Sequence, residues 1–259
     1  MAQDLVDRRR ERMSSLLRDR SYLPVSELCR RFQISQATAR RDLSELSRQK
    51  QVVRTFGGAM ADYDRRFAPF AARLKIAARA KARIAAAAVE LIKPGSTVFL
   101  DAGTTLFAVS GALRRRAAGQ GFPSIRVVTN SMAVAESLAT ARGVTVDLLG
   151  GRMLPNQSVL LGNETCKAAA FYQFDWAFLG AEGFDAAGIW NSGQEVVEIQ
   201  QAVLERSRHH ALLLDGGKLG LGAPALLMTW EQADVLITDA DLDKIATVSD
   251  LIPGKVRTV

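Results

Sequence analysis

Residues 34–43 read Ile-Ser-Gln-Ala-Thr-Ala-Arg-Arg-Asp-Leu, and this stretch decides how the first part of the chain folds. Ser35 is a favourable N-cap, because its hydroxyl can accept a hydrogen bond from a backbone N–H of the first helical turn. The helix that follows carries Ala39, Leu43 and Leu46 at helical spacing, which predicts one apolar stripe facing a core. Its outer face carries arginine, as in a helix that enters a DNA major groove, although an ordinary solvated basic face would show the same pattern.

Two segments before this helix indicate how it is held. Residues 8–20 predict a basic helix, and Pro24 breaks the helical pattern because proline cannot continue a helix. Ser26 is expected to cap a second, short helix, which leads through a tight connection at Gln33 and Ile34 into the next helix. The residues expected to face inward are Met13, Leu16, Leu17, Leu28, Cys29 and Phe32. Helix, short helix, tight turn and basic helix together predict a helix-turn-helix.

Residues 51–59, Gln-Val-Val-Arg-Thr-Phe-Gly-Gly-Ala, predict a wing after the basic helix. The two valines and Phe56 suit a strand, and the glycine pair suits a tight turn. Arg54 would then meet phosphate or the minor groove, whereas a plain hairpin that only covers the core is the alternative. The predicted DNA-binding residues are Ser35, Gln36, Ala37, Thr38, Arg40, Arg41, Ser44, Arg48 and Arg54.

Positive charge is concentrated in the first 60 residues, which hold 13 Lys/Arg against 7 Asp/Glu. The rest of the chain holds 21 against 20, so almost all of the net charge of +7 lies in the first quarter. A basic module on a near-neutral body is the pattern of a nucleic-acid binder. A membrane-surface module is less favoured, because it would need large apolar residues opposite the charge, and here those residues form a core.

Length and composition exclude several classes of protein. The 259 residues suggest two domains, and a hydrophobic content of 48% supports packed cores. No apolar span is long enough for a membrane helix, and the polar N-terminal residues lack a signal-peptide core. Cys29 and Cys166 are expected to be reduced and buried, as in a cytoplasmic protein. The two histidines, His209 and His210, have no Cys/His cluster beside them, so no metal and no cofactor are predicted.

The chain after residue 60 predicts a mostly parallel α/β domain. Residues 61–75 have mixed charge and no clear period, and are interpreted as a linker between a winged helix-turn-helix over 1–60 and an effector-sensing domain over 76–259. After an Ala-rich helix over 77–92, apolar runs alternate with helical stretches, which is typical of a parallel sheet covered by helices. The predicted strands are 97–100, 125–128, 144–149, 176–179, 211–214 and 235–237, and the predicted helices include 104–116, 131–141 and 194–208.

Polar residues follow most of these strands, at the edge where ligands collect in open α/β sheets. Residues 101–105, Asp-Ala-Gly-Thr-Thr, lead from a strand into a helix whose N-terminus favours an anion. Such residues are also ordinary turn formers, which is the alternative for any single turn. Their recurrence favours one site for a small, polyhydroxylated anion, with threonines and amides on the anion, acids or Asn130 on hydroxyls, and Lys218 or Arg152 adding positive charge. The predicted effector-binding residues are Asp101, Gly103, Thr104, Thr105, Asn130, Ser131, Gly150, Gly151, Arg152, Glu182 and Lys218.

Both parts of the chain resemble the DeoR family of transcriptional regulators. The first part matches that family's winged helix at Val25-Ser26-Glu27-Leu28, Ser35, Thr38, Arg40-Arg41-Asp42-Leu43, Leu46, Arg54 and Gly57-Gly58-Ala59. Residues 81–244 are similar to its sensor domain, whose fold is shared with ribose-5-phosphate isomerase, glucosamine-6-phosphate deaminase and the CoA-transferases. The matching positions there are Lys81, Ile84, Pro94-Gly95, Asp101, Gly103-Thr104-Thr105, Thr129-Asn130-Ser131, Leu149-Gly150-Gly151, Gly162, Phe178, Gly180, Glu195, Asp215, Lys218 and Thr238-Asp239.

The resemblance implies a repressor of a sugar or sugar-derivative catabolic operon, released from its operator by a phosphorylated sugar. The chain departs from the family pattern at Lys50 and Phe56 beside the wing, and at Ile199, Gly217 and the stretch 188–192 in the sensor. The sensor departures suggest an effector that is bulkier or differently charged.

Two other functions fit parts of the pattern. Asp101, Glu182, Glu195 and Lys218 could serve a sugar-phosphate isomerase-like enzyme, but no close pair or triad is visible and the basic module would be unexplained, so no catalytic residue is predicted. RNA binding ranks last, because the aromatic content is 7% and the basic module lacks aromatics for stacking. One winged helix reads only a short half-site, so a homo-oligomer, a dimer or a tetramer, on double-stranded operator DNA is expected.

Overall fold

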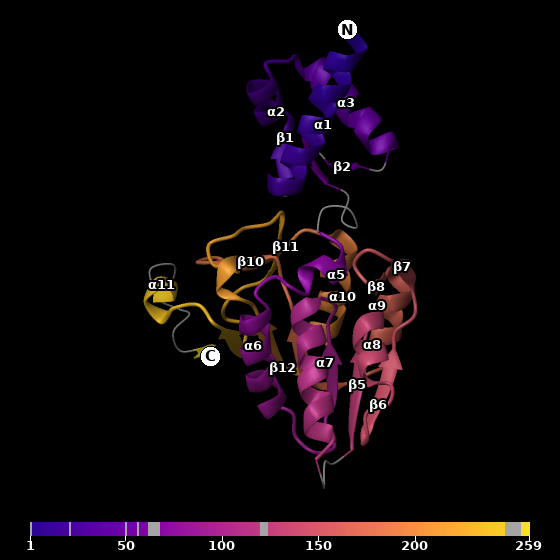
Figure 1. Cartoon of the computed structure of the whole chain (residues 1–259), viewed down its shortest axis with the longest axis vertical. Coiled ribbons are helices and arrows are strands. Elements are labelled where there is room, and N and C mark those ends of the chain that lie inside the picture. Colours follow the sequence, from indigo (N-terminus) through magenta and orange to yellow (C-terminus); the bar gives the residue numbers. More distant parts are fainter. Residues whose placement is uncertain are drawn as a thin grey trace. The chain divides into compact units, whose positions relative to one another are not determined.

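The computed structural model describes residues 2–20, 22–49, 51–55, 57–61, 68–119, 124–246 and 255–259 (Figure 1). The chain divides into two units, Met1–Pro69 and Phe70–Val259, and each unit has its own hydrophobic core. The predictions that concern Lys50 and Phe56 lie outside the described residues.

The first unit is a winged helix-turn-helix. Its elements in chain order are α1 (Ala2–Arg20), β1 (Tyr22–Pro24), α2 (Val25–Phe32), α3 (Gln36–Arg48), β2 (Val52–Thr55) and β3 (Gly58–Ala61). The strands form one antiparallel sheet in the order β1-β3-β2. The predicted stripe of α3 is confirmed, because Ala39, Leu43 and Leu46 are all buried, and the two leucines pack with Met13 and Leu17 of α1.

Two local predictions for this unit are wrong. Ser26 does not cap α2, because the helix begins at Val25, with extended Pro24 at the N-cap and no side-chain bond to the first turn. Cys29 is half-buried rather than buried, as is Cys166 in the second unit, although neither forms a disulfide. The tight turn between α2 and α3 is present, and Gln33 makes it by adopting a left-handed backbone with φ of 52°.

A buried carboxylate joins α1 to α3. Asp42 is 1% exposed and accepts hydrogen bonds from Arg9 Nε at 2.7 Å and Arg10 Nε at 2.8 Å. Two cations on one helix therefore neutralise one anion on the other, which offsets the cost of taking that carboxylate out of water.

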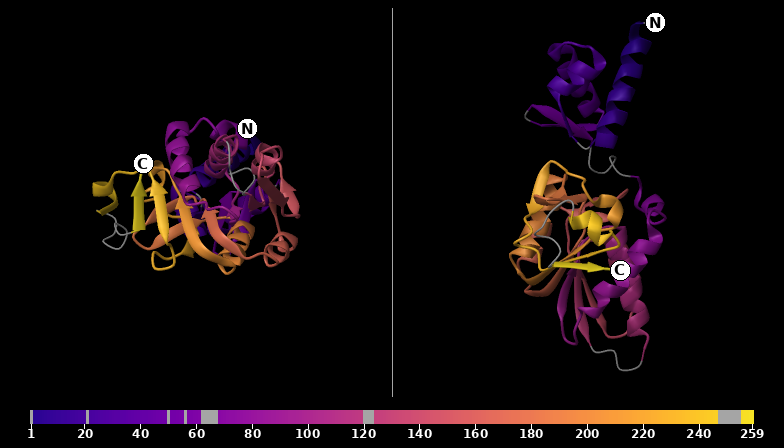
Figure 2. Two further views of the ribbon diagram at one scale, coloured as in Figure 1. Left: turned by 90° about the horizontal axis from the view of Figure 1, so that it is seen from below. Right: turned by 90° about the vertical axis from the view of Figure 1, so that its left-hand side faces the viewer.

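The second unit is built on a seven-stranded sheet in which every pair of neighbouring strands is parallel, in the order β15-β14-β12-β9-β4-β5-β6. The strands are β4 (Thr97–Leu100), β5 (Ile125–Thr129), β6 (Val144–Leu148), β9 (Phe174–Leu179), β12 (Ser207–Leu213), β14 (Val235–Thr238) and β15 (Val256–Thr258). Helices α6 (Ala78–Glu90) and α7 (Thr104–Ala117) cover one face, and α10 (Gln194–Leu204) covers the other (Figure 2).

Smaller elements surround this sheet. They are α5 (Phe70–Arg73), α8 (Met132–Leu138), α9 (Asn163–Ala169), α11 (Leu242–Ala246), the 3-10 turn η1 (Gly216–Lys218), the hairpin β7 (Arg152–Leu154) with β8 (Val159–Leu161), and the antiparallel sheet of β10 (Gly183–Asp185), β11 (Gly188–Asn191) and β13 (Ala225–Met228). No helix among the described residues has both the length and the hydropathy needed to cross a bilayer.

All six predicted strands are present, whereas some predicted boundaries are wrong. The helix predicted over 194–208 ends at Leu204, because the chain from Ser207 onward pairs with β9 as β12. Regular structure also enters the predicted linker at both ends, since Ala61 closes β3 and Phe70 begins α5. The sequence does not predict the short antiparallel strands of the second unit, β7, β8, β10, β11 and β13, because segments of three or four residues show too little periodicity.

The path of the chain through the large sheet reverses between β4 and β9. From β4 the chain runs to β5 and β6 on one side, and then returns to β9 on the other side of β4 and continues to β12, β14 and β15. Ligands bind in open α/β sheets at such a reversal, outside the carboxyl ends of the strands. The fold therefore directs attention to the residues that follow β4 and β9.

The Asp42 contact generates a stability prediction. Asp42→Asn should lower the free energy of unfolding of the first unit by about 3 kcal/mol, because two arginines lose their shared buried anion. Hydrogen exchange of the α1 and α3 amides in the full chain measures this loss. Glu27→Gln is the matched control, because Glu27 pairs with Arg30 and Arg31 at the surface, where solvent screens the ion pairs and their loss should change the free energy of unfolding far less. Equal exchange rates in the two variants would contradict the assignment.

Candidate DNA-binding surface and effector site

As the sequence predicts, α3 has a side-chain cap at its N-terminus and its outer face is exposed. Ser35 is the N-cap, and its hydroxyl accepts a hydrogen bond from the Thr38 backbone N–H at 3.2 Å. The predicted contact positions Gln36, Ala37, Arg40, Arg41, Ser44 and Arg48 are exposed, and Thr38 is half-buried. The helix therefore presents a polar, arginine-bearing face to solvent, opposite its buried stripe.

The arginines of α3 differ in what their charges face. Arg48 is held by Glu45, with the shortest contact at 2.6 Å, and hydrogen bonding to Arg48 lowers the pKa of that glutamate to about 2. Arg40 reaches only the neutral Gln36, at 3.5 Å, and Arg41 forms no ion pair with any residue that the structure describes. Arg40 and Arg41 therefore offer a less neutralised positive charge than Arg48 does.

The wing contacts α3 through two of the predicted DNA-binding residues. Arg54 of β2 donates a hydrogen bond to the Ser44 hydroxyl at 2.8 Å, so two residues ten positions apart belong to one exposed surface. This contact places the guanidinium of Arg54 beside the outer face of α3.

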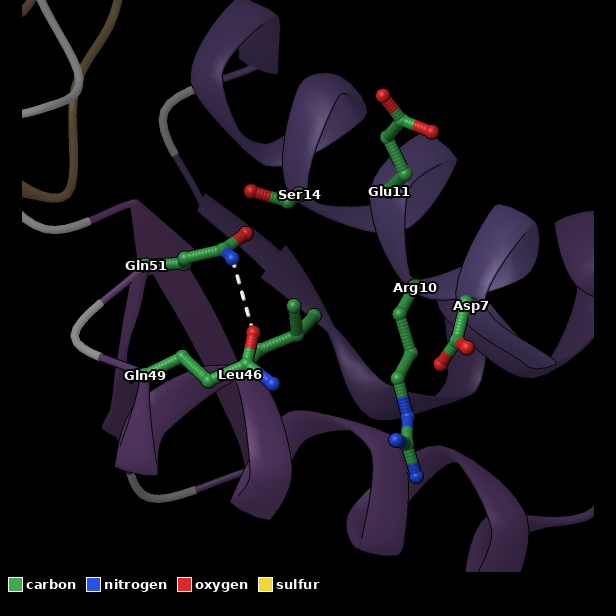
Figure 3. Close-up of a pocket in the computed structure, with 7 residues that line it drawn as sticks. All are labelled: Asp7, Arg10, Glu11, Ser14, Leu46, Gln49 and Gln51. Carbon is green, nitrogen blue, oxygen red and sulfur yellow. Dashed lines mark hydrogen bonds between the residues drawn. The ribbon is translucent and has the colours of Figure 1, made fainter. Parts of the chain in front are cut away.

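A cavity of about 550 Å³ opens on a different part of this unit. Figure 3 shows its lining, which comes from α1, the last turns of α3 and the chain leading into β2: Asp7, Arg10, Glu11, Ser14, Leu46, Gln49 and Gln51. The Gln51 backbone N–H donates to the Leu46 carbonyl at 2.9 Å across the turn. None of the nine predicted DNA-binding residues lines this cavity, so it is separate from the predicted DNA-binding surface.

In the second unit, the predicted effector residues follow five neighbouring strands of the sheet. In sheet order, the carboxyl ends of β12, β9, β4, β5 and β6 carry Lys218, Glu182, the loop 101–105, Asn130 with Ser131, and residues 150–152. Glu182 and the loop 101–105 flank the reversal between β4 and β9, and Lys218 follows the next strand, β12. The sequence could not order them, because it does not show that β9 pairs with β4.

Asp101 has contacts that were not foreseen. It is 3% exposed, and its carboxylate accepts hydrogen bonds from the Ala102 N–H at 2.7 Å, the Gly180 N–H at 3.3 Å and the Gln200 side-chain amide at 2.7 Å. Burial raises the pKa of this carboxyl to about 6, although the hydrogen bonds act in the opposite direction. Asp101 therefore joins the loop after β4 to the loop after β9, and its oxygens face protein donors.

Residues 103–105 lie at the start of α7, and we call them the anion cradle after the role predicted for them. Gly103 is the N-cap and has φ of 124°, a backbone conformation that glycine adopts far more readily than other residues. Thr104 and Thr105 are buried in the first turn, where the helix dipole and unpaired N–H groups attract negative charge. This geometry suits an anion, and the role of residues 103–105 in binding one stays a prediction.

Lys218 lies close enough to Asp101 to influence its charge, and Lys81 lies close to Lys218, although only Lys218 is a predicted effector residue. Lys218 donates to the Ala181 carbonyl at 2.5 Å, and Lys81 of α6, which is 6% exposed, donates to the Ile76 carbonyl at 2.7 Å. Desolvation lowers the pKa of both lysines, and their proximity lowers that of Lys81 further, while Asp215 acts against this. Lys81 was matched to the family without a role, because a single lysine in an Ala-rich helix carries no signal of its own.

A buried chain of polar side chains was also missed. Gln200 of α10, which bonds Asp101, accepts a hydrogen bond from the Asn191 side-chain amide at 3.0 Å. The backbone N–H of Ser192 then bonds Asn191 Oδ1, and Ser192 also donates to Glu182. The chain thus runs from Asp101 to Glu182, two acids that the sequence analysis treated as independent.

The remaining predicted residues divide between the site and its edge. Asn130 is 1% exposed, and no residue described by the structure donates a hydrogen bond to its Oδ1 atom. Ser131 caps α8, which is a structural task. Gly151 has φ of 143° and leaves no room for a Cβ atom, which would lie 2.1 Å from Thr165 Oγ1, and Arg152 is paired with Glu195 at the surface. Turn geometry accounts for the glycine at 151 and a surface ion pair engages Arg152, while the part of residues 150–152 in effector binding stays a prediction.

The raised pKa of Asp101 generates a pH prediction. Because the pKa lies near 6 in the folded protein and near 3.8 ordinarily, the stabilising contribution of the neutral carboxyl is complete below pH about 4 and is lost as pH rises through about 6. Between pH 7.5 and pH 5, the free energy of unfolding of the wild type should rise by about 1 kcal/mol relative to Asp101→Asn.

Tryptophan fluorescence during urea unfolding measures this change, because the three tryptophans, Trp176, Trp190 and Trp230, all belong to the second unit. The exposed Asp243→Asn is the control and should follow the wild type. Parallel curves for wild type and Asp101→Asn across this pH range would show that burial does not favour the neutral carboxyl.

Comparison with known proteins agrees with this architecture. The family model of the DeoR-like helix-turn-helix domain matches residues 9–64, and that of the DeoR C terminal sensor domain matches residues 76–240. The Glycerol-3-phosphate regulon repressor of Escherichia coli is 31% identical over 226 residues, which cover 87% of each chain. The transcriptional repressor GlcR of Bacillus subtilis is 28% identical and covers 86% of this chain and 84% of its own.

Among solved structures, ribose 5-phosphate isomerase A of Methanocaldococcus jannaschii aligns with 55% of each chain at 16% identity and a TM-score of 0.41. The curated relatives are named as regulators of transcription, which favours the regulator over the isomerase-like enzyme considered above. With both of its units matched by family models, the chain belongs to the DeoR family of transcriptional regulators.

Proposed function

We propose that this protein is a cytoplasmic repressor that binds operator DNA through its first unit and leaves it when its second unit binds a phosphorylated sugar or sugar derivative. The observation that carries this proposal is the buried turn of residues 103–105 at the N-terminus of α7, directly after Asp101, together with Lys218, which lies close to Asp101, and Lys81, which lies close to Lys218. A phosphate group suits such a place, because backbone N–H groups, the helix dipole and the lysines all favour a dianion.

The rest of the site suits the hydroxyl groups of a sugar. Asn130 Oδ1 is a buried acceptor without a donor among the described residues, and a ligand hydroxyl would satisfy it. The name of the Escherichia coli relative includes a phosphorylated three-carbon polyol, glycerol 3-phosphate, which supports the same chemical class for this chain.

Release from DNA follows from linkage. An effector that binds one arrangement of the protein better than the DNA-bound one shifts the population toward it, and a coupling of ~1–3 kcal/mol changes operator affinity by roughly 5–150-fold. We further infer that the protein works as a homo-oligomer, a dimer or a tetramer, because one winged helix reads too short a half-site for a unique operator. Sedimentation velocity of the full chain measures this state.

The DNA surface is tested at Arg41. Arg41→Ala should weaken binding to an operator selected from random duplexes by roughly 10-fold or more, because a bidentate base contact discriminates by ~1–3 kcal/mol. If Arg41 contacts only phosphate, affinity should fall uniformly across sequences and the salt slope should decrease by about one. Fluorescence anisotropy across a salt series separates the two cases. Arg115→Ala is the control, because Arg115 is an exposed arginine of α7. Equal operator affinities of the two variants would show that Arg41 does not contact DNA.

The effector site is tested at Lys218. A thermal-shift screen of triose, pentose and hexose phosphates, including glycerol 3-phosphate, identifies ligands of the full chain. Lys218→Met should keep operator affinity but require at least roughly tenfold more of the active compound for release, because the anion loses an ammonium group. Lys167→Met is the control, because Lys167 is an exposed lysine that pairs with Glu164. If the Lys218→Met protein left the operator at the same concentration of the compound as the wild type does, the anion would have to bind elsewhere.

A further inference from the structure

Gln200 joins three separate segments of the second unit through one side chain. Its amide nitrogen donates to Asp101 Oδ2 at 2.7 Å and to the Gly180 carbonyl at 2.8 Å, and its Oε1 accepts from Asn191 Nδ2 at 3.0 Å. The residue is 0% exposed. Both amide N–H groups and the amide oxygen are therefore committed to protein partners, which fixes the orientation of the side chain.

These partners lie on both sides of the reversal in the sheet. Asp101 follows β4, Gly180 follows β9, and Asn191 ends β11. Gln200 itself belongs to α10, which packs on the sheet at β9 and β12. One neutral amide thus sets the spacing between the loop that leads into the anion cradle and the loop that carries Glu182.

The neutrality of this amide matters for Asp101. The other charged group near Asp101 is Lys218, and Glu182 and Asp215 in turn lie near Lys218. Direct donors to the carboxylate are two backbone N–H groups and Gln200, so no cation bonds Asp101 among the described residues. Among the described residues, Gln200 is therefore the side chain that bonds the Asp101 carboxylate directly and holds its orientation.

We propose that Gln200 is a positioning residue of the effector site, which sets the orientation of Asp101, and through it the anion cradle at residues 103–105, without contacting the effector. This inference rests on the proposed effector site. It predicts that the donor character of residue 200, rather than its volume, determines how tightly the sensor holds an anion.

The test compares two substitutions of similar size in the full chain. Gln200→Met removes all three hydrogen bonds of the side chain. Gln200→Glu replaces the amide by a carboxyl group, which can donate to Asp101 only when one of the two carboxyls is protonated. Low pH favours that state, because two adjacent carboxylates do not both ionise readily. Gln201→Met and Gln201→Glu, at the exposed neighbouring position, are matched controls. Calorimetric titrations with inorganic phosphate and with glycerol 3-phosphate at pH 6.0, 7.0 and 8.5 give the ratio of each variant's Kd to that of the wild type, which cancels the titration of the phosphate itself.

Gln200→Met should bind these probes roughly 10-fold more weakly than the wild type at every pH. Gln200→Glu should be equally weak at pH 8.5 and return toward the wild-type Kd at pH 6.0, and both Gln201 variants should match the wild type. Recovery on acidification cannot come from a misfolded sensor, so it distinguishes positioning from a general loss of structure. A Gln200→Met Kd within twofold of the wild type, or the same pH profile for Met and Glu, would overturn the proposal.

A separate measurement distinguishes failure of this inference from failure of the proposed function. If the wild type binds neither probe, the proposed anion site is wrong, and Gln200 is then judged by the carboxyl ¹³C resonance of Asp101 in the ligand-free protein. Because the amide donor stabilises the ionised form, the pKa of Asp101 should rise in Gln200→Met. An unchanged titration midpoint would overturn the positioning role.

Discussion

The carboxylate of Asp101 is the interaction on which the sensor unit depends. It lies where the chain leaves the sheet in opposite directions, and it bonds the loop after β4 to the loop after β9. A reversal of this kind leaves two neighbouring strand ends without a shared crossover, so something must hold their loops together. A buried acid with three donors does so, and the Gly-Thr-Thr segment that follows it begins α7 at the sheet edge where ligands bind in open α/β folds.

Burying that acid has a cost that the site does not fully remove. Asp101 bonds an amide and two backbone N–H groups instead of an arginine or a lysine, and its pKa accordingly lies near 6. The DNA-binding unit solves the same problem differently, because the buried Asp42 receives two guanidinium groups. The charge of Asp42 is thus balanced within its own unit, whereas Asp101, without a bonded cation among the described residues, stays sensitive to any change in the charge around it.

The sequence predicts the helices and strands of this protein better than it predicts which of them lie next to one another. The apolar stripe of α3, the N-cap Ser35 and all six predicted strands follow from local periodicity and capping, and these are properties of contiguous residues. The order of the strands does not, because the pairing of β4 with β9 joins residues about 80 positions apart. Gln200 was missed for the same reason: it reads as one more polar residue on a helix until the fold brings it to Asp101.

The charge of the first unit also changes meaning once its contacts are known. Thirteen basic residues lie in the first 60 positions, but Arg9, Arg10, Arg30, Arg31 and Arg48 are in ion pairs with acids of the same unit. On the outer face of α3 and the wing, Arg40, Arg41 and Arg54 contact only neutral groups or no described partner. Each phosphate that such a cation neutralises releases counterions from DNA, which favours binding at low salt. An arginine that is paired with an acid must leave that partner before it can meet a phosphate, whereas Arg40, Arg41 and Arg54 need not, so basic residues that count equally in the sequence differ in what they can contribute to DNA binding.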